Sequence, residues 1–137
     1  MAEPGWNDLA LTTGTAAVIL EALGYTAKSD ILGVPIIHQA MADKNLDAFF
    51  GSWDPAMQTF VEAYEKDGSV ERININLEGA KYTFGVPGYV YEAGVHDFGD
   101  LQMLAAQFDK KMNGIEAGSN ALMFDMINDK AFGLERW

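Results

Sequence analysis

Apolar residues recur with the spacing of an α-helix in three stretches of the N-terminal half of the chain. Gly24 and Gly68 follow the first and third stretches, at positions where glycine commonly ends a helix. The second and third stretches are expected to begin at Pro35 and at Asp54-Pro55. Proline fits the first helical turn, and aspartate is a good N-cap. The pattern predicts helices over residues 8–23, 35–44 and 54–65.

Short runs with strand character separate these helices and continue beyond them. The clearest run, residues 72–77 (Arg-Ile-Asn-Ile-Asn-Leu), alternates apolar and polar side chains and predicts a strand with one solvated face. The order β-α-β-α-β predicts an α/β protein with mostly parallel sheets flanked by helices. The expected strands cover residues 29–34, 45–50, 70–77, 81–86 and 113–115, with further helices over 98–108 and 119–129 and an irregular stretch over 89–94.

Residues 78–80 (Glu-Gly-Ala) break the pattern of expected strands and helices, and the two halves of the sequence on either side have similar patterns. Such an interruption suits a hinge. We therefore expect two parts, residues 1–78 and residues 79–137, of which the second begins with the hinge.

The formal net charge of −11 over 137 residues limits the partners of this chain. It argues against nucleic acid and against an anionic membrane surface, and it favours a cationic ligand. There is no cysteine, which excludes a disulfide framework and a cysteine-based metal site. No apolar run approaches the roughly 20 residues of a membrane span, and residues 1–4 lack the character of a secretory signal.

The residue patterns of common enzyme sites do not occur here. His38 and His96 stand apart from any His/Asp/Glu cluster with metal-ligand spacing, which favours packing or surface roles for both. No serine lies in a Gly-x-Ser-x-Gly elbow, and the glycine-rich residues 114–120 lack the Lys-Ser/Thr of a phosphate loop. We expect no catalytic activity, no metal and no cofactor.

Three aromatic residues, Trp6, Trp53 and Tyr82, fall at the edges of expected elements beside Gly, Asn, Asp or Lys. Three such rings can enclose a quaternary ammonium group, which has no hydrogen-bond donor and is recognised by apolar fit and by attraction to ring faces. Each ring contributes about 0.5 to 2 kcal/mol. Asp8 would add a countercharge two residues from Trp6. The alternative interpretation is that these rings are ordinary core aromatics.

Seven motifs together resemble the choline and glycine-betaine substrate-binding proteins of ABC importers, over nearly the whole chain. The resemblance implies a type II periplasmic binding protein with two α/β lobes that close on a small quaternary amine, and it implies ABC transporter membrane subunits as partners. The motifs are residues 5–8 (Gly-Trp-Asn-Asp), 51–57 (Gly-Ser-Trp-Asp-Pro-Ala-Met), 67–71 (Asp-Gly-Ser-Val-Glu), 76–83 (Asn-Leu-Glu-Gly-Ala-Lys-Tyr-Thr), 85–94 (Gly-Val-Pro-x-Tyr-x-Tyr-Glu-Ala-Gly), 114–116 (Gly-Ile-Glu) and 131–134 (Ala-Phe-Gly-Leu).

The resemblance also assigns ligand-binding roles to individual residues. It implies that Trp6, Trp53 and Tyr82 are walls of an aromatic box and that Asp8 supplies the carboxylate near the cation. It further implies that Ser119 or Asn120 reaches the polar end of the ligand, where the family pattern is closer to Gly-Asn-Asp than to the Gly-Ser-Asn found here.

Members of that family are about twice as long as this chain. The comparison therefore implies an incomplete two-lobe architecture, with residues 1–78 as part of lobe I without its first strand and residues 79–137 as the hinge and part of lobe II. Unpaired strand edges and uncovered apolar faces would remain, so we expect a homo-oligomer, in the first instance a dimer. The alternative function is a truncated fragment that persists as a self-associating structural or interaction protein without ligand binding.

Overall fold

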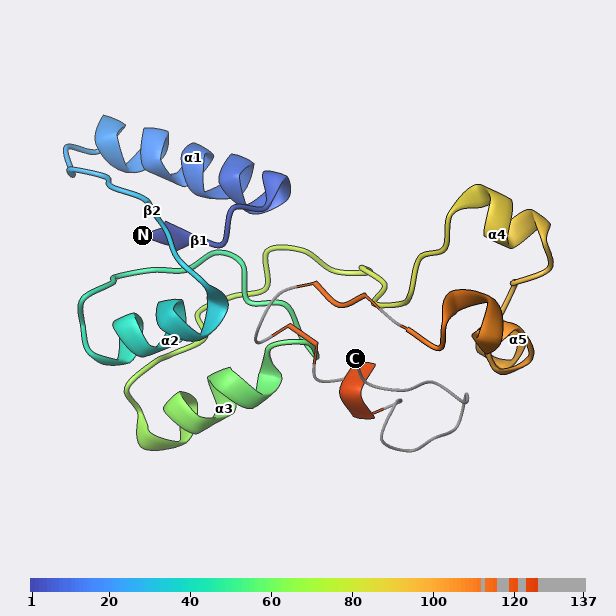
Figure 1. Ribbon diagram of the computed structural model, residues 1–137. Coiled ribbons are helices and arrows are strands. Elements are labelled where there is room, and N and C mark those ends of the chain that lie inside the picture. Colours follow the sequence, from blue (N-terminus) through green and yellow to red (C-terminus); the bar gives the residue numbers. More distant parts are fainter. Residues whose placement is uncertain (112, 116–118, 121–122, 126–137) are drawn as a thin grey trace. The chain divides into compact units, whose positions relative to one another are not determined.

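A computed structural model describes residues 1–111, 113–115, 119–120 and 123–125 of the 137-residue chain (Figure 1). The chain divides into two compact units, Met1–Glu78 and Gly79–Trp137. Each unit has its own cluster of buried apolar residues.

The first unit is built around a small parallel sheet. Strand β1 (Ala2–Glu3) pairs with β2 (Asp30–Ile31), Ala2 opposite Asp30 and Glu3 opposite Ile31. Parallel pairing requires a crossover connection, and helix α1 (Asn7–Ala22) supplies it. Strand β1 lies before Trp6, so the expectation that no strand precedes this residue is wrong.

Two further helices complete the first unit. Helix α2 (Val34–Ala42) lies against β1 and against α3 (Gln58–Asp67), as Figure 1 shows. The core at this junction consists of Ala2, Ile37 and Leu46, all buried, with Phe49 packed against them. Burial of this cluster, together with the β1–β2 pair, fixes α2 against the sheet.

Helix α1 matches the predicted range to within one residue. The side of the helix that is buried, however, differs from the side that its helical pattern predicts. Leu9 and Thr13 are its buried residues, whereas Ile19 and Leu23, which the helical pattern places on the inward face, are exposed. Apolar side chains surround this helix, so periodicity alone does not select the face that the sheet covers.

Helix α3 begins four residues later than predicted. Residues 54–57 form a turn, and the backbone N–H of Met57 donates to the carbonyl of Trp53 at 2.8 Å. Asp54 does not cap the helix, because its carboxylate pairs with Arg72 instead and Met57 occupies the N-cap position. Gly68 ends α3 in the left-handed conformation, with φ of 76°.

The second unit contains α4 (Gly88–Glu92), α5 (Phe98–Leu104) and the 3-10 helix η1 (Ala105–Phe108). Helices α5 and η1 confirm the helix predicted over 98–108, and α4 replaces the irregular stretch expected over 89–94. Asp97 caps α5 by accepting hydrogen bonds from the backbone of Gly99 and Asp100. The buried core of this unit consists of Val90, Val95, Leu101, Ala105 and Met123.

Most of the predicted strands do not form. Residues 45–50, 70–77, 81–86 and 113–115 carry no strand in the described structure, and the run expected over 29–34 shortens to β2. Alternation of side chains makes a segment suitable for a sheet, but a strand also needs a neighbour, and these segments have none among the described residues. Of the helix expected over 119–129, residues 123–125 are helical, 119–120 are not, and the rest lies outside the described residues.

Candidate ligand-binding site

Trp6 is the residue from which α1 begins. It occupies the N-cap position with an extended backbone (φ −89°, ψ 138°), and its carbonyl accepts a hydrogen bond from the N–H of Ala10 at 2.8 Å. The indole is half-buried, and Asp8 is exposed in the first turn of the helix. A carboxylate is favourable in this turn, because the backbone N–H groups there carry partial positive charge.

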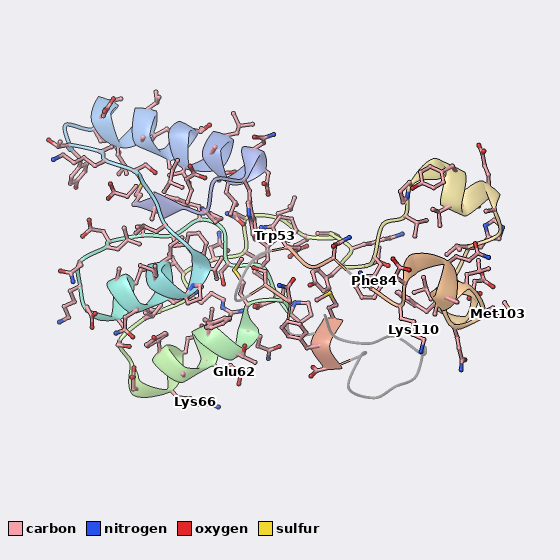
Figure 2. The ribbon with its side chains drawn as sticks, in the orientation of Figure 1. Trp53, Glu62, Lys66, Phe84, Met103 and Lys110 are labelled. Atoms are coloured by element: carbon pink, nitrogen blue, oxygen red, sulfur yellow. The ribbon has the colours of Figure 1, made fainter. Side chains whose placement is uncertain are left out.

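Trp53 lies in a loop that packs on the same end of α1. Gly51 sits directly against Leu9, since a Cβ added to this glycine would lie 2.2 Å from Leu9 Cδ1. The N–H of Trp53 faces the sulfur of Met57 at 3.5 Å, and Met57 is fully buried. Anchored on both sides, the half-buried Trp53, labelled in Figure 2, is held near the first turn of the helix that Trp6 opens.

Tyr82 belongs to the second unit, and the residue is 42% exposed. Its hydroxyl donates a hydrogen bond to the backbone carbonyl of Ser119 at 2.9 Å. The Ser119 side chain is buried, and its hydroxyl has no partner within the described part of the chain. A buried hydroxyl without a partner is uncommon in folded proteins and marks this position as unusual.

A pocket of about 330 Å³ lies next to this contact, within the second unit. Tyr82 and Asn120 line it, and Ser119 does not. Its wall is mainly apolar, with one cationic side chain. The other lining residues are Thr83, Phe84, Gly85, Val86, Pro87, Val90, Leu101, Lys111, Asn113, Gly114, Ile115 and Met123.

Asn120 holds the turn at one side of the pocket. Its Oδ1 accepts a hydrogen bond from the N–H of Ile115 at 2.8 Å. A Cβ at Gly114 would lie 2.7 Å from the same oxygen, so this turn needs glycine at position 114. Asn120 therefore has a structural role in addition to its place on the pocket wall.

Phe84 is a pocket residue that the sequence reasoning did not single out. Its ring meets that of Phe98 edge to face, with centroids 5.6 Å apart at 85°. The signal available in the sequence was its position in the run 81–86, two residues after Tyr82 and on the same side of an extended chain.

His38 is a core residue. Its side chain is fully buried, its Nδ1 donates to the carbonyl of Val34 at 2.9 Å, and its ring contacts Phe49 and Phe60. Because a carbonyl only accepts, Nδ1 carries the proton, and Nε2 has no partner among the described residues. Burial lowers the pKa of His38, and the hydrogen bond to Val34 offsets this lowering only in part.

His96 is exposed, and its ring lies edge-on against Tyr91 with centroids 4.3 Å apart. Asp100 accepts hydrogen bonds from the backbone N–H groups of His96 and Asp97, and these bonds lower the pKa of its carboxyl group. Within the described residues, no three His, Asp or Glu side chains are grouped so as to hold a metal ion. The same part of the chain contains no helix that is long and apolar enough to cross a membrane.

The six residues singled out in the sequence divide between the two units. The first unit brings Trp6, Asp8 and Trp53 to one end of α1, and the second brings Tyr82 and Asn120 to one pocket with Ser119 behind Tyr82.

Similarity to a solved structure defines the fold class. The chain resembles an ABC-transporter choline binding protein in complex with choline, with a TM-score of 0.89 and 38% sequence identity. The match covers 98% of this chain and 48% of that chain. The protein thus has the α/β fold of the type II periplasmic binding proteins in an incomplete form, which confirms the predicted fold class.

The family follows from the sequence itself. A family model for the substrate binding domain of the ABC-type glycine betaine transport system (OpuAC) matches residues 1–135, and the chain belongs to this family. Its members are non-catalytic transport components that act outside the cytoplasm. The resemblance noted from the motifs is confirmed.

A curated relative adds a second comparison. A protein of Chromohalobacter salexigens, described as "Uncharacterized protein ORF1", is 46% identical over 119 residues, which are 87% of this chain and 77% of the relative. By contrast, the present chain spans about half the length of the choline binding protein that it matches.

Proposed function

We propose that this chain binds a quaternary ammonium compound, choline or glycine betaine, as the substrate-binding component of a periplasmic ABC import system. The observation that carries the proposal is the similarity, over 98% of the chain, to a protein solved in complex with choline. The membrane subunits of the transporter are the proposed partners. Residues 1–78 and 79–137 are proposed as parts of the two lobes, with the hinge after Glu78.

Aromatic rings are the proposed means of recognition. A quaternary ammonium group offers no hydrogen-bond donor, so a ring face is the chemistry that selects it. Trp6, Trp53 and Tyr82 all keep part of their surface accessible. Asp8 is exposed within the first turn of α1 and is proposed as the countercharge to the ligand cation.

The polar end of the ligand is assigned to the second unit. Asn120 lines the pocket beside Tyr82, and its amide nitrogen is a donor suited to a hydroxyl or carboxylate group. Ser119 has a buried hydroxyl that lacks a partner among the described residues, although it does not line the pocket. Of the two, Asn120 is therefore the stronger candidate for direct contact.

Titration calorimetry with choline, glycine betaine and carnitine tests the proposal, with tryptophan fluorescence as a second signal. Heat from choline or glycine betaine together with a change in indole emission supports it. Tetramethylammonium, which has the cation but no polar end, separates the two halves of the proposed recognition. Absence of heat and of any fluorescence change with all these compounds contradicts ligand binding, while membership of the family stands.

The second candidate function is self-association without ligand binding. The observation that favours it is a row of exposed apolar side chains at Ile73, Ile75 and Leu77. Neighbouring exposed apolar side chains of this kind are typical of an interaction surface. A homodimer is the proposed form, and sedimentation over a dilution series distinguishes it from a monomer.

A further inference from the structure

The pocket of the second unit carries a positive charge in a strongly acidic chain. Asp and Glu make up 20 of the 137 residues, yet none of the described residues that line the pocket is acidic. Lys111 is the one charged residue among them. A positive charge beside a mainly apolar wall attracts an anionic group of a ligand.

Lys111 is held only loosely by the protein itself. Its Nζ lies 4.0 Å from a carboxylate oxygen of Asp109, and the two side chains are 61% and 83% exposed. Asp109 does not line the pocket. An exposed ion pair at this distance contributes little to stability, so the ammonium group can turn from Asp109 to a ligand carboxylate at small cost.

The rest of the pocket wall suits the other parts of a small zwitterion. Tyr82 and Phe84 bring aromatic rings to the pocket, and ring faces attract a quaternary ammonium group. Phe84, labelled in Figure 2, is supported by its edge-to-face contact with Phe98. Asn113 adds an amide whose N–H groups can donate to a carboxylate. The pocket volume of about 330 Å³ lies within the range of small-molecule sites.

We propose that Lys111 selects a ligand with a carboxylate group, so that this chain binds glycine betaine in preference to choline. The inference rests on the proposed function, because both compounds carry the quaternary ammonium group and differ at the other end. Choline ends in a hydroxyl group and has a net positive charge, which Lys111 repels. Glycine betaine ends in a carboxylate, which accepts a charge-assisted hydrogen bond from the lysine ammonium group. The zwitterion also brings its own countercharge to a pocket whose described wall has no acidic residue.

The same charge sets the orientation of the ligand. The carboxylate lies beside Lys111, and the quaternary ammonium group lies against the aromatic rings, away from the lysine. Asn113 and Asn120 are neutral donors that serve a hydroxyl group and a carboxylate alike. Discrimination between the two compounds therefore depends on Lys111.

Titration calorimetry of Lys111→Gln with glycine betaine and with choline tests the proposal. Glutamine keeps a polar side chain and removes the charge, so we expect the Kd for glycine betaine to rise about 3- to 10-fold. The Kd for choline should stay the same or fall slightly, because the repulsion is gone. Lys110→Gln is the matched control. It changes the net charge equally at the neighbouring residue, which does not line the pocket, and should leave the ratio of the two Kd values unchanged.

Further measurements isolate the charge of Lys111. Lys111→Arg keeps the charge and should retain the preference for glycine betaine. Asp109→Asn removes the competing carboxylate and should lower the Kd for glycine betaine about twofold. Glycine betaine methyl ester, which has the cation but no carboxylate, should not lose affinity in Lys111→Gln. Rising salt concentration should narrow the preference, because the ion pair is screened.

The outcomes separate this inference from the proposed function. If the unmodified chain binds choline as tightly as glycine betaine, or if Lys111→Gln changes both Kd values equally, selection by Lys111 is overturned while binding of quaternary amines stands. If neither compound binds the unmodified chain, the proposed function fails and this inference fails with it.

Discussion

Gly51 lies so close to Leu9 that a side chain at position 51 would overlap the leucine, with a Cβ 2.2 Å from Leu9 Cδ1. We therefore expect Gly51→Ala to destabilise the first unit by about 1 to 3 kcal/mol through overpacking. The substitution also displaces the loop that carries Trp53. Urea unfolding followed by tryptophan fluorescence measures the change.

Gly14→Ala is the matched control for that experiment. Gly14 lies inside α1 with open space around its Cα, so alanine there improves helix propensity and stabilises by roughly 0.5 to 1 kcal/mol. If both substitutions leave the unfolding midpoint unchanged, the close contact between position 51 and Leu9 is not present in solution.

Two adjacent isoleucines of α2 give a prediction about the core. Ile37 is fully buried and Ile36 is 59% exposed. We expect Ile37→Ala to cost about 2 to 5 kcal/mol, because it removes buried apolar contacts and leaves a cavity. Ile36→Ala changes the same residue type on the same helix and should stay within about 0.5 kcal/mol. Similar effects of the two substitutions, measured by chemical denaturation, would show that α2 packs through another face.

The buried His38 predicts a pH dependence of stability. Its folded pKa lies below the ordinary value of about 6.5, because burial disfavours the charged ring. As the pH falls below about 6.5, the unfolded chain takes up the proton first, so stability is highest above this pH and declines below it. The slope from this residue is at most about 1.4 kcal/mol per pH unit.

Unfolding curves from pH 7.5 to pH 5.5 test this dependence. His38→Asn should lose this part of the slope, whatever its effect on absolute stability, and His96→Asn should retain it because His96 is exposed. An identical slope in the natural chain and in His38→Asn contradicts the prediction.

Trp53→Ala tests the proposed aromatic recognition. Loss of one ring from around a quaternary ammonium costs about 0.5 to 2 kcal/mol, which is roughly a 2- to 30-fold increase in Kd for choline. Tyr25→Ala removes an exposed ring elsewhere in the first unit and should leave the Kd unchanged. Calorimetry gives both values, and equal affinities for the two variants would exclude Trp53 from the site.

Two substitutions at Tyr82 distinguish the contribution of its ring from that of its hydroxyl group. Tyr82→Phe loses the hydrogen bond to the Ser119 carbonyl and keeps the ring, so we expect about 1 kcal/mol less stability in the second unit and little change in choline affinity. Tyr82→Ala should raise the Kd as well. Equal Kd values for the two variants would mean that Tyr82 acts through its hydroxyl or does not contact the ligand.

Helices were the part of the fold that the sequence predicted well. Helical periodicity, a starting proline and a terminal glycine are local signals, and α1 and α2 begin within one residue of the predicted positions. The start of α3 was misplaced because Asp54 has two possible roles. Its carboxylate pairs with Arg72, eighteen residues away, and no local pattern reveals that contact.

Most of the strand predictions were wrong for a related reason. The alternation at 72–77 is nearly perfect, yet a strand depends on a partner that is distant in sequence or absent. At the candidate site, the placement of Trp6 at the start of a helix was predictable from residues 5–8. The bond from Asn120 to the turn at Gly114-Ile115 was not, because it depends on a glycine that leaves room for the amide.

The connection between the two units offers an experimental advantage. Residues 71–83 are exposed throughout, and within this stretch Lys81 is a trypsin site at which the described structure shows no hydrogen bond or ion pair. Exposed chain of this kind is where proteases cut first. Limited digestion at Lys81 would yield Trp6 and Trp53 on one peptide and Tyr82 on another, so the affinity of each peptide for choline is open to direct measurement.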